Sequence, residues 1–186
     1  MSKFLNWFLA ALVCMAIAGA ETAQQPGGAQ PSAGSQRMQE RVTREVFHEL
    51  IMLPQRTIFD NLQYKVDGST VVLMGQVTNA SLKDSAEKVV KGIEGVEQVN
   101  NQIEVLPASP GDDRIRQQVA HAIFNDNRLF RYSLGAVPPI HIIVNKGHVT
   151  LEGAVNSQAD KDAAFIRANG VPGVLSVENH LQVTGS

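Results

Sequence analysis

The chain contains one stretch of sequence twice. When the sequence is shifted against itself by 78 residues, residues 66–105 align with residues 144–183 without a gap, and 14 of the 40 paired positions are identical. The identities fall mainly on valine and glycine, and Asn101 pairs with Asn179. Repeats of this kind form equivalent structural units. The chain is therefore expected to fold as two copies of one small module.

Each copy carries the same succession of helix and strand patterns. Apolar residues recur every four positions at its start, which predicts a helix with one buried face. Two alternating segments flank turns at Asp67-Gly68 and Lys146-Gly147, which predicts a hairpin. A second helix, over residues 80–91 and 158–169, leads to a third strand. The predicted fold class is α+β, with two αββαβ modules, each a small three-stranded mixed sheet with two helices packed on one face.

Two pairs of glycines shared by the copies have predicted roles. Gly92 and Gly170 directly follow the second helix, where a glycine in a left-handed conformation commonly ends a helix. Gly75 and Gly153 lie inside a strand, where the missing side chain permits a bulge or the close approach of a helix.

Residues 1–20 have the pattern of a secretory signal peptide. Lys3 precedes an almost unbroken apolar stretch, and Ala18-Gly19-Ala20 matches the small-residue cleavage pattern, so cleavage is predicted after Ala20. A retained N-terminal anchor is the alternative. Cys14, the single cysteine, lies in this segment without a small residue directly before it, so lipid attachment is not expected.

Composition divides the rest of the chain. Residues 21–36 are rich in Gln, Pro, Gly, Ala and Ser, and are predicted to be a disordered tether. The two modules are assigned to residues 37–106 and 112–184. Residues 107–111 read Pro-Ala-Ser-Pro-Gly and are assigned as the linker between them.

Charge and motifs argue against several classes of function. The net charge of −2 gives no basic excess, so nucleic acid is not expected as a partner. The sequence has no nucleophile elbow and no paired carboxylates, which argues against an enzyme. The five histidines lack the spacing of metal ligands and are interpreted as solvated surface residues, so no metal or cofactor is expected. His141 and His180 are predicted to share the outer face of the second sheet.

The repeated pattern resembles the BON (bacterial OsmY and nodulation) domain family. The residues that carry the resemblance are Gly147-x-Val149-x-Leu151-x-Gly153-x-Val155 and Val171-Pro-Gly-Val174-x2-Val177-x-Asn179-x-Leu181, with weaker counterparts in the first copy. The resemblance implies a non-enzymatic module of the cell envelope that binds phospholipid, in a setting of osmotic or envelope stress. Lipid-associated members are typically lipoproteins, so the missing lipid-attachment motif favours a soluble periplasmic protein.

Each copy also serves as a reference for the other. In the second helix of the first copy, two charged residues lie outside the predicted buried face, and the register places Phe165 and Ile166 at their positions in the second copy. Apolar side chains beside cations can dock at the boundary of lipid headgroups. The candidate lipid-binding residues are therefore Lys161, Phe165, Ile166 and Arg167. The alternative is a rotated helix, with Phe165 or Ile166 packed in the core or against the first module.

A second candidate lies in the connection after the first helix of the second copy. It consists of Leu129, Phe130, Arg131 and Tyr132, and its counterpart in the first copy is less aromatic. A cap on the core or a contact between the modules is favoured here over a ligand-binding role.

Taken together, these features predict a periplasmic, envelope-associated binding protein whose partner is an anionic phospholipid or membrane surface. The alternative is a protein-interaction or chaperone-like adaptor for envelope proteins, which would use a sheet face or an edge strand. A carbohydrate binder is disfavoured, because few aromatic residues are available to form a binding platform.

Overall fold

The computed structural model describes residues 33–135 and 138–185. The predicted signal peptide and most of the predicted tether lie outside this part of the chain. The first helix, α1, spans Ala33–Ile51, so it begins within the segment predicted to be a tether.

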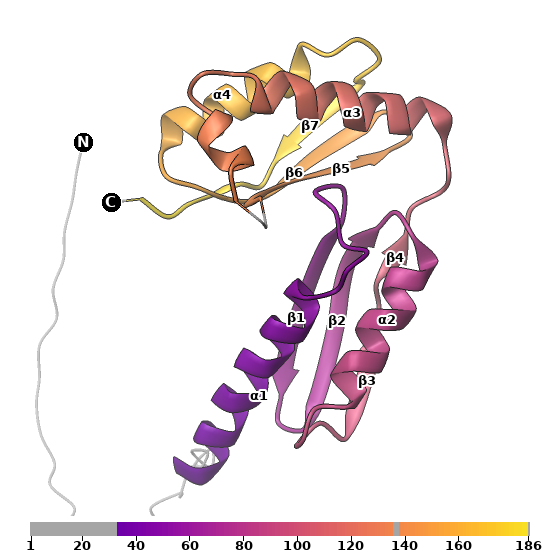
Figure 1. The fold of residues 1–186 in the computed structure, drawn as a ribbon, viewed down its shortest axis with the longest axis vertical. Helices are drawn as coiled ribbons and strands as arrows, with labels where there is room; N and C mark the ends of the chain where they lie inside the picture. Colours follow the sequence, from indigo (N-terminus) through magenta and orange to yellow (C-terminus); the bar gives the residue numbers. More distant parts are fainter. Residues whose placement is uncertain (1–32, 136–137, 186) are drawn as a thin grey trace, which may run out of the picture. The chain divides into compact units, whose positions relative to one another are not determined.

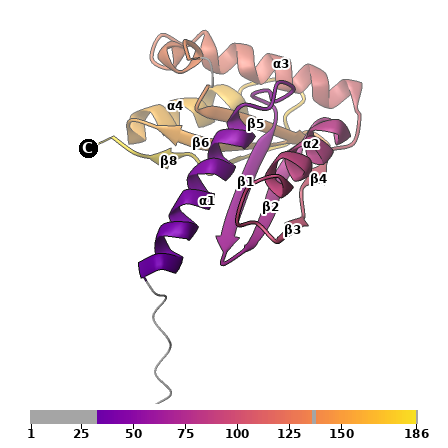
Figure 2. The ribbon, with the colours of Figure 1, turned by 60° about the horizontal axis from the view of Figure 1, so that its bottom comes forward.

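The first module continues from α1 in the predicted order (Figure 1). Its remaining elements are β1 (Asn61–Asp67), β2 (Thr70–Val77), α2 (Ala80–Lys91), β3 (Gln98–Asn101) and β4 (Glu104–Val105). Strands β1 and β2 form an antiparallel hairpin, and β3 and β4 both pair with β2 in parallel. Figures 1 and 2 show α1 and α2 on the same face of this sheet.

The second module repeats this arrangement. Its elements are α3 (Pro110–Phe124), a short 3-10 helix η1 (Phe130–Ser133), β5 (Ile140–Asn145), β6 (His148–Val155), α4 (Gln158–Asn169), β7 (Ser176–Asn179) and β8 (Gln182–Val183). Strands β5 and β6 are antiparallel, and β7 and β8 pair with β6 in parallel. The predicted αββαβ order is confirmed in both modules, and the approximate bounds predicted for the second helix agree with α2 and α4.

The third strand of each module is split into two short pieces by a repeated asparagine. The side chain of Asn179 donates to the carbonyl of Lys161 at 2.8 Å and accepts from the amide of Leu181 at 3.2 Å. Asn101 makes the same two contacts in the first module, at 3.1 and 3.2 Å. The side chain thus ties the strand to the neighbouring helix and turns the next apolar residue, which is buried, towards the core. This role explains why asparagine occurs at both positions.

Gly75 and Gly153 each lie very close to the backbone of another segment. That segment is the start of β1 in the first module and the residue before β5 in the second. The two glycines have φ angles of +105° and +111°. A Cβ on Gly75 would lie 2.0 Å from the carbonyl oxygen of Asn61, and one on Gly153 would lie 1.9 Å from that of Pro139. The predicted close approach of a helix is wrong, because the nearest backbone at these glycines belongs to Asn61 and Pro139, neither of which lies in a helix.

The prediction of left-handed caps at Gly92 and Gly170 is wrong. Both residues are right-handed, with φ near −80°, and their amides still donate to helix carbonyls. The left-handed conformation occurs three residues later, at Gly95 and Gly173. Each helix therefore ends in an extra turn before the chain reverses.

The two cores differ along the second helix. In α2 the residues buried against the sheet are Leu82, Ala86 and Val90, and in α4 they are Asp160, Ala164 and Ala168. The buried face of α4 is therefore smaller and carries a charge. Leu129 and Tyr132, from the segment around η1, are buried in the same core and add apolar volume there. This difference in packing leaves α4 with its larger apolar residues on the outside.

Candidate functional site

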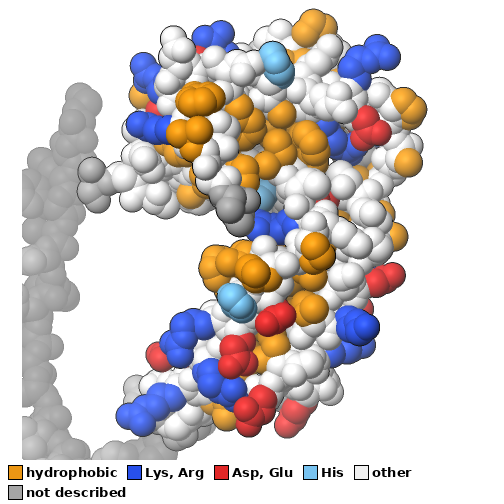
Figure 3. Space-filling model, in the orientation of Figure 1, with side chains coloured by type: hydrophobic (Ala, Val, Ile, Leu, Met, Phe, Trp, Pro, Cys, Tyr) orange, Lys and Arg blue, Asp and Glu red, His pale blue; other side chains and the backbone are white. Residues whose placement is uncertain are grey.

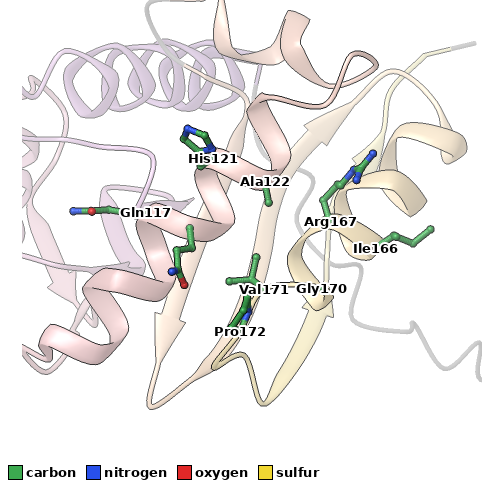
Figure 4. Close-up of a pocket in the computed structure, with 9 residues that line it drawn as sticks. Gln117, His121, Ala122, Ile166, Arg167, Gly170, Val171 and Pro172 are labelled. Atoms are coloured by element: carbon green, nitrogen blue, oxygen red, sulfur yellow. The ribbon is translucent and has the colours of Figure 1, made fainter.

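The outer face of α4 carries two large apolar side chains. Ser157 caps the helix with its hydroxyl, and Ala164 and Ala168 fix its buried side. Phe165 and Ile166 are then 39% and 66% exposed. The alternative in which either residue packs into the core is excluded by these values. Ile166 also points away from α3 in Figure 4.

The residue at the position of Phe165 makes polar contacts in the first module. Glu87, the counterpart of Phe165, accepts a hydrogen bond from Asn101 at 3.0 Å and forms an ion pair with Lys91. These contacts lower the pKa of Glu87, with the hydrogen bond from Lys91 as the largest cause. The counterpart asparagine, Asn179, contacts the backbone of α4 in the same way but has an apolar residue beside it instead of a carboxylate. An ordinary solvated helix face has thus become apolar in the second module.

A third apolar substitution was not singled out from the sequence. Leu175, which precedes β7, is 71% exposed, and its amide donates to the carbonyl of Gly147 at 2.9 Å. Its counterpart is Glu97, which accepts a hydrogen bond from Ser69. The same comparison of the two copies could have found it, because the register pairs Leu175 with Glu97. Leu175 is therefore a third exposed apolar side chain of the second module at a position where the first module has a charged residue.

Cations flank these apolar side chains, although Arg167 is not free. Its Nε and Nη2 atoms both lie 2.8 Å from Oδ2 of Asp126. Lys161 lies one turn before Phe165 on α4. Figure 3 shows hydrophobic side chains next to Lys and Arg side chains on the face of the second module that is in view. We refer to Lys161, Phe165, Ile166, Arg167 and Leu175 as the α4 surface.

An open groove lies between α3 and α4 at one side of this surface (Figure 4). Its lining combines polar side chains of α3, such as Gln117 and His121, with Arg167 and the apolar residues Val171 and Pro172. A second, smaller hollow next to it shares His121 and Arg167 and is lined by Asn125 and Asp126. Arg167 therefore borders both hollows.

The second candidate set divides into buried and exposed residues. Leu129 and Tyr132 are buried, whereas Phe130 is exposed and the Arg131 side chain is half exposed. The hydroxyl of Tyr132 donates to Asp160 at 2.9 Å and accepts from the amide of Asn156, and Arg131 forms an ion pair with Asp160. These contacts are those of a cap on the core, which is one of the two roles favoured from the sequence.

Asp160 is held in its charged form by these partners. Burial acts to raise its pKa, but hydrogen bonds from Ser157, Tyr132 and Arg131 outweigh burial and lower the pKa overall. The carboxylate is therefore a fixed structural charge that positions the η1 segment beside α4.

The interpretation of the histidines as solvated is wrong for His141. Four of the five are exposed, but His141 is partly buried, and its Nε2 lies 3.1 Å from Nη2 of Arg56. Burial, together with the nearby charge of Arg56, lowers the pKa of His141 to about 4. Glu152 lies opposite His141 in the strand register and 2.8 Å from His180, so the two histidines share a sheet face as predicted.

Residues 33–135 and 138–185 include no group of three or more potential ligands arranged to hold a metal ion. Within the same ranges, the helices are too short or too polar to cross a membrane.

The comparisons with known proteins agree with the repeat. The BON domain family model matches residues 41–107 and again residues 111–185. The chain belongs to the BON domain family. Osmotically-inducible protein Y of Escherichia coli (strain K12) is 32% identical over 131 residues, which cover 66% of this chain and 61% of that protein. Outer membrane lipoprotein DolP of Haemophilus influenzae is 32% identical over 118 residues, which cover 60% of this chain and 58% of that protein. The matched parts thus span about three fifths of these BON relatives.

Among solved structures, the C-terminal domain of CdsD, a structural protein of the type III secretion system of Chlamydia trachomatis, aligns with a TM-score of 0.30 and 12% identity. The alignment covers 75% of this BON chain and 96% of that chain. A likeness this weak carries no argument about function.

Proposed function

We propose that this BON protein is a non-enzymatic binding protein of the cell envelope that contacts anionic phospholipid through its second BON domain. The observation that carries the proposal is the replacement of charged surface residues by exposed apolar ones. In the aligned modules, Glu87, Lys88 and Glu97 of the first domain correspond to Phe165, Ile166 and Leu175 of the second.

The α4 surface has the chemistry of an interfacial membrane contact. Full burial of a large apolar side chain is worth about 1.5–3 kcal/mol, so partial insertion of Phe165, Ile166 and Leu175 favours association. On this proposal, Lys161 and Arg167 would meet lipid phosphates as these side chains enter the headgroup region. The expected association is weak and sensitive to salt, because a few partly buried side chains must offset the cost of ordering the protein at the surface.

The proposed setting is the periplasm, reached by export and by cleavage of the signal peptide after Ala20, without lipid attachment. The names of the BON relatives, one osmotically inducible and one an outer membrane lipoprotein, support an envelope location and a link to osmotic or envelope stress. Either the inner or the outer membrane would offer anionic phospholipid to such a protein.

Co-sedimentation of the mature chain with phosphatidylglycerol vesicles tests this function. Wild type is expected to sediment with the vesicles, and Phe165→Glu to lose most of the bound fraction, because a charge on this face opposes insertion. Gln98→Glu is the matched control, since it adds the same charge to an exposed position of the first domain and is expected to bind like wild type.

Two results would contradict the proposal. The first is a wild-type protein that stays in solution, and the second is equal binding by Phe165→Glu and wild type. Polypeptides that remain bound to the protein in envelope extract after detergent has removed the lipid would instead favour the adaptor hypothesis.

A further inference from the structure

The ion pair between Arg167 and Asp126 has an asymmetric geometry. Nε and Nη2 of Arg167 converge on the same oxygen of Asp126, Oδ2, each at 2.8 Å. The other carboxylate oxygen, Oδ1, accepts a hydrogen bond from the amide of Arg128 at 2.8 Å. The guanidinium therefore does not engage both carboxylate oxygens in the parallel arrangement that makes arginine–oxyanion pairs strongest.

The two partners also differ in freedom. Asp126 is only 13% exposed and is fixed by the turn that follows α3, where its hydrogen bonds with the amide of Arg128 and with Arg167 lower its pKa. The Arg167 side chain is 55% exposed and borders both hollows beside α4. An incoming anion thus has access to the guanidinium while the carboxylate stays in place.

We propose that Asp126 is an internal competitor for Arg167, and that the phosphate of a membrane phospholipid displaces it when the α4 surface docks. A phosphate presents two oxygens to the guanidinium and can form the bidentate contact that Asp126 does not form. Arg167 is half exposed and Asp126 keeps its hydrogen bond with the amide of Arg128 during the exchange, so the exchange is expected to have a modest cost. The inference rests on the proposed function, and it makes Asp126 a residue that weakens membrane binding in the wild-type protein.

The first domain has no equivalent of this pair. Its residues at the corresponding positions are Glu49 and Val89, which cannot form an ion pair. The competitor therefore occurs in the domain that carries the exposed apolar side chains, where the availability of Arg167 would affect membrane binding.

Asp126→Asn is the central variant. It removes the charge but keeps a side-chain oxygen that can accept from the amide of Arg128, so the turn is expected to remain folded, as circular dichroism would show. Binding to phosphatidylglycerol vesicles is expected to rise about two- to five-fold over wild type, the range that corresponds to the loss of an exposed ion pair. Asp162→Asn, on the same helix as Arg167, controls for the change in net charge and is expected to give a smaller gain in binding.

The decisive comparison repeats Asp126→Asn in an Arg167→Gln background. General electrostatics predicts the same fold-gain in both backgrounds, whereas competition for Arg167 predicts a gain at least twice as large when the arginine is present. Equal gains would overturn the proposal. The proposed function is tested separately by Phe165→Glu. If binding depends on Phe165 but the two backgrounds show equal gains, only the proposal that Asp126 competes for Arg167 is rejected.

Two further arms complete the test. If neither wild type nor Asp126→Asn binds vesicles, both proposals fail, whereas binding by Asp126→Asn alone would support the competitor. Inorganic phosphate and chloride are compared as competitors at the same ionic strength. Release of wild type that is stronger with phosphate and disappears in Arg167→Gln supports a lipid phosphate at this guanidinium, whereas a phosphate effect that persists in Arg167→Gln would contradict it.

Discussion

At the scale of single residues, two buried polar groups set the chemistry of the second domain. Asp160 replaces the apolar residue Leu82 of the first domain and is surrounded by Tyr132, Arg131 and the cap of α4. His141 replaces an ordinary exposed strand residue and lies against Arg56. The surroundings favour one protonation state of each group, the charged carboxylate of Asp160 and the neutral imidazole of His141.

Asp160→Ala is expected to lower the free energy of unfolding by about 1–3 kcal/mol, because it leaves the buried hydroxyl of Tyr132 without its acceptor. Urea denaturation of the mature protein measures the change. Tyr132→Phe removes the other half of the same contact and is expected to destabilise less than Asp160→Ala. A shift below about 0.5 kcal/mol for Asp160→Ala would mean that the contact does not hold η1.

His141 gives a pH dependence with a defined sign. Its pKa is about 4 in the folded protein and near 6.5 when unfolded, so the unfolded state binds more protons between these values. Stability contributed by neutral His141 is therefore complete above about pH 6.5 and is lost as the pH falls towards 4. The expected loss from this residue between pH 7.5 and pH 5 is about 2 kcal/mol.

Unfolding experiments on wild type and His141→Gln at several pH values isolate this contribution. Glutamine can still accept from Arg56 but does not titrate, so the variant is expected to show a shallower decline in stability on acidification. Parallel curves for the two proteins would show that His141 does not titrate as its burial requires.

At the scale of elements, the hairpin of each domain requires a glycine at one position of its second strand, Gly75 in β2 and Gly153 in β6. A Cβ at Gly75 or Gly153 would overlap a backbone carbonyl oxygen that cannot move independently of its strand, and both residues have φ angles that L side chains rarely adopt. Gly68 shares the positive φ but has open space around it.

Gly153→Ala is expected to destabilise the second domain by more than about 3 kcal/mol, and Gly75→Ala to do the same in the first. Gly68→Ala is the matched control and is expected to cost about 1 kcal/mol, because it introduces only conformational strain. Chemical denaturation followed by circular dichroism distinguishes them. Similar losses for Gly68→Ala and Gly153→Ala would contradict the role of the close approach.

The same elements mark what the sequence can predict. The periods of apolar residues and the repeat were sufficient to predict α2 and α4, because those signals come from burial within one element. The burial of His141 and the pairing of Arg167 with Asp126 depend on contacts between segments distant in sequence, so local pattern does not contain them. Phe165 and Ile166 could be predicted because the first domain supplied a reference for the same helix.

At the scale of the whole molecule, duplication has produced two domains with one fold and different surfaces. The first domain, residues 37–106, has 8 basic and 10 acidic residues, and residues 110–186 have 7 of each. The exposed apolar substitutions lie in the domain with the less negative charge. An anionic membrane would therefore attract the second domain more than the first. Only the second domain has large apolar side chains on the outer face of its second helix that could insert.

An exchange of the two surfaces tests this division. Phe165→Glu, Ile166→Lys and Leu175→Glu together give the second domain the residues of the first, and vesicle binding is expected to fall at least ten-fold, which corresponds to about 1.4 kcal/mol of lost insertion. All three positions are exposed, so the fold is expected to persist. The reverse exchange, Glu87→Phe, Lys88→Ile and Glu97→Leu, is expected to increase binding by giving the first domain an equivalent surface. If the first exchange left binding intact, the membrane contact would have to lie outside the α4 surface. If the reverse exchange had no effect, apolar exposure on this helix would not be sufficient, and the cations and groove of the second domain would be required as well.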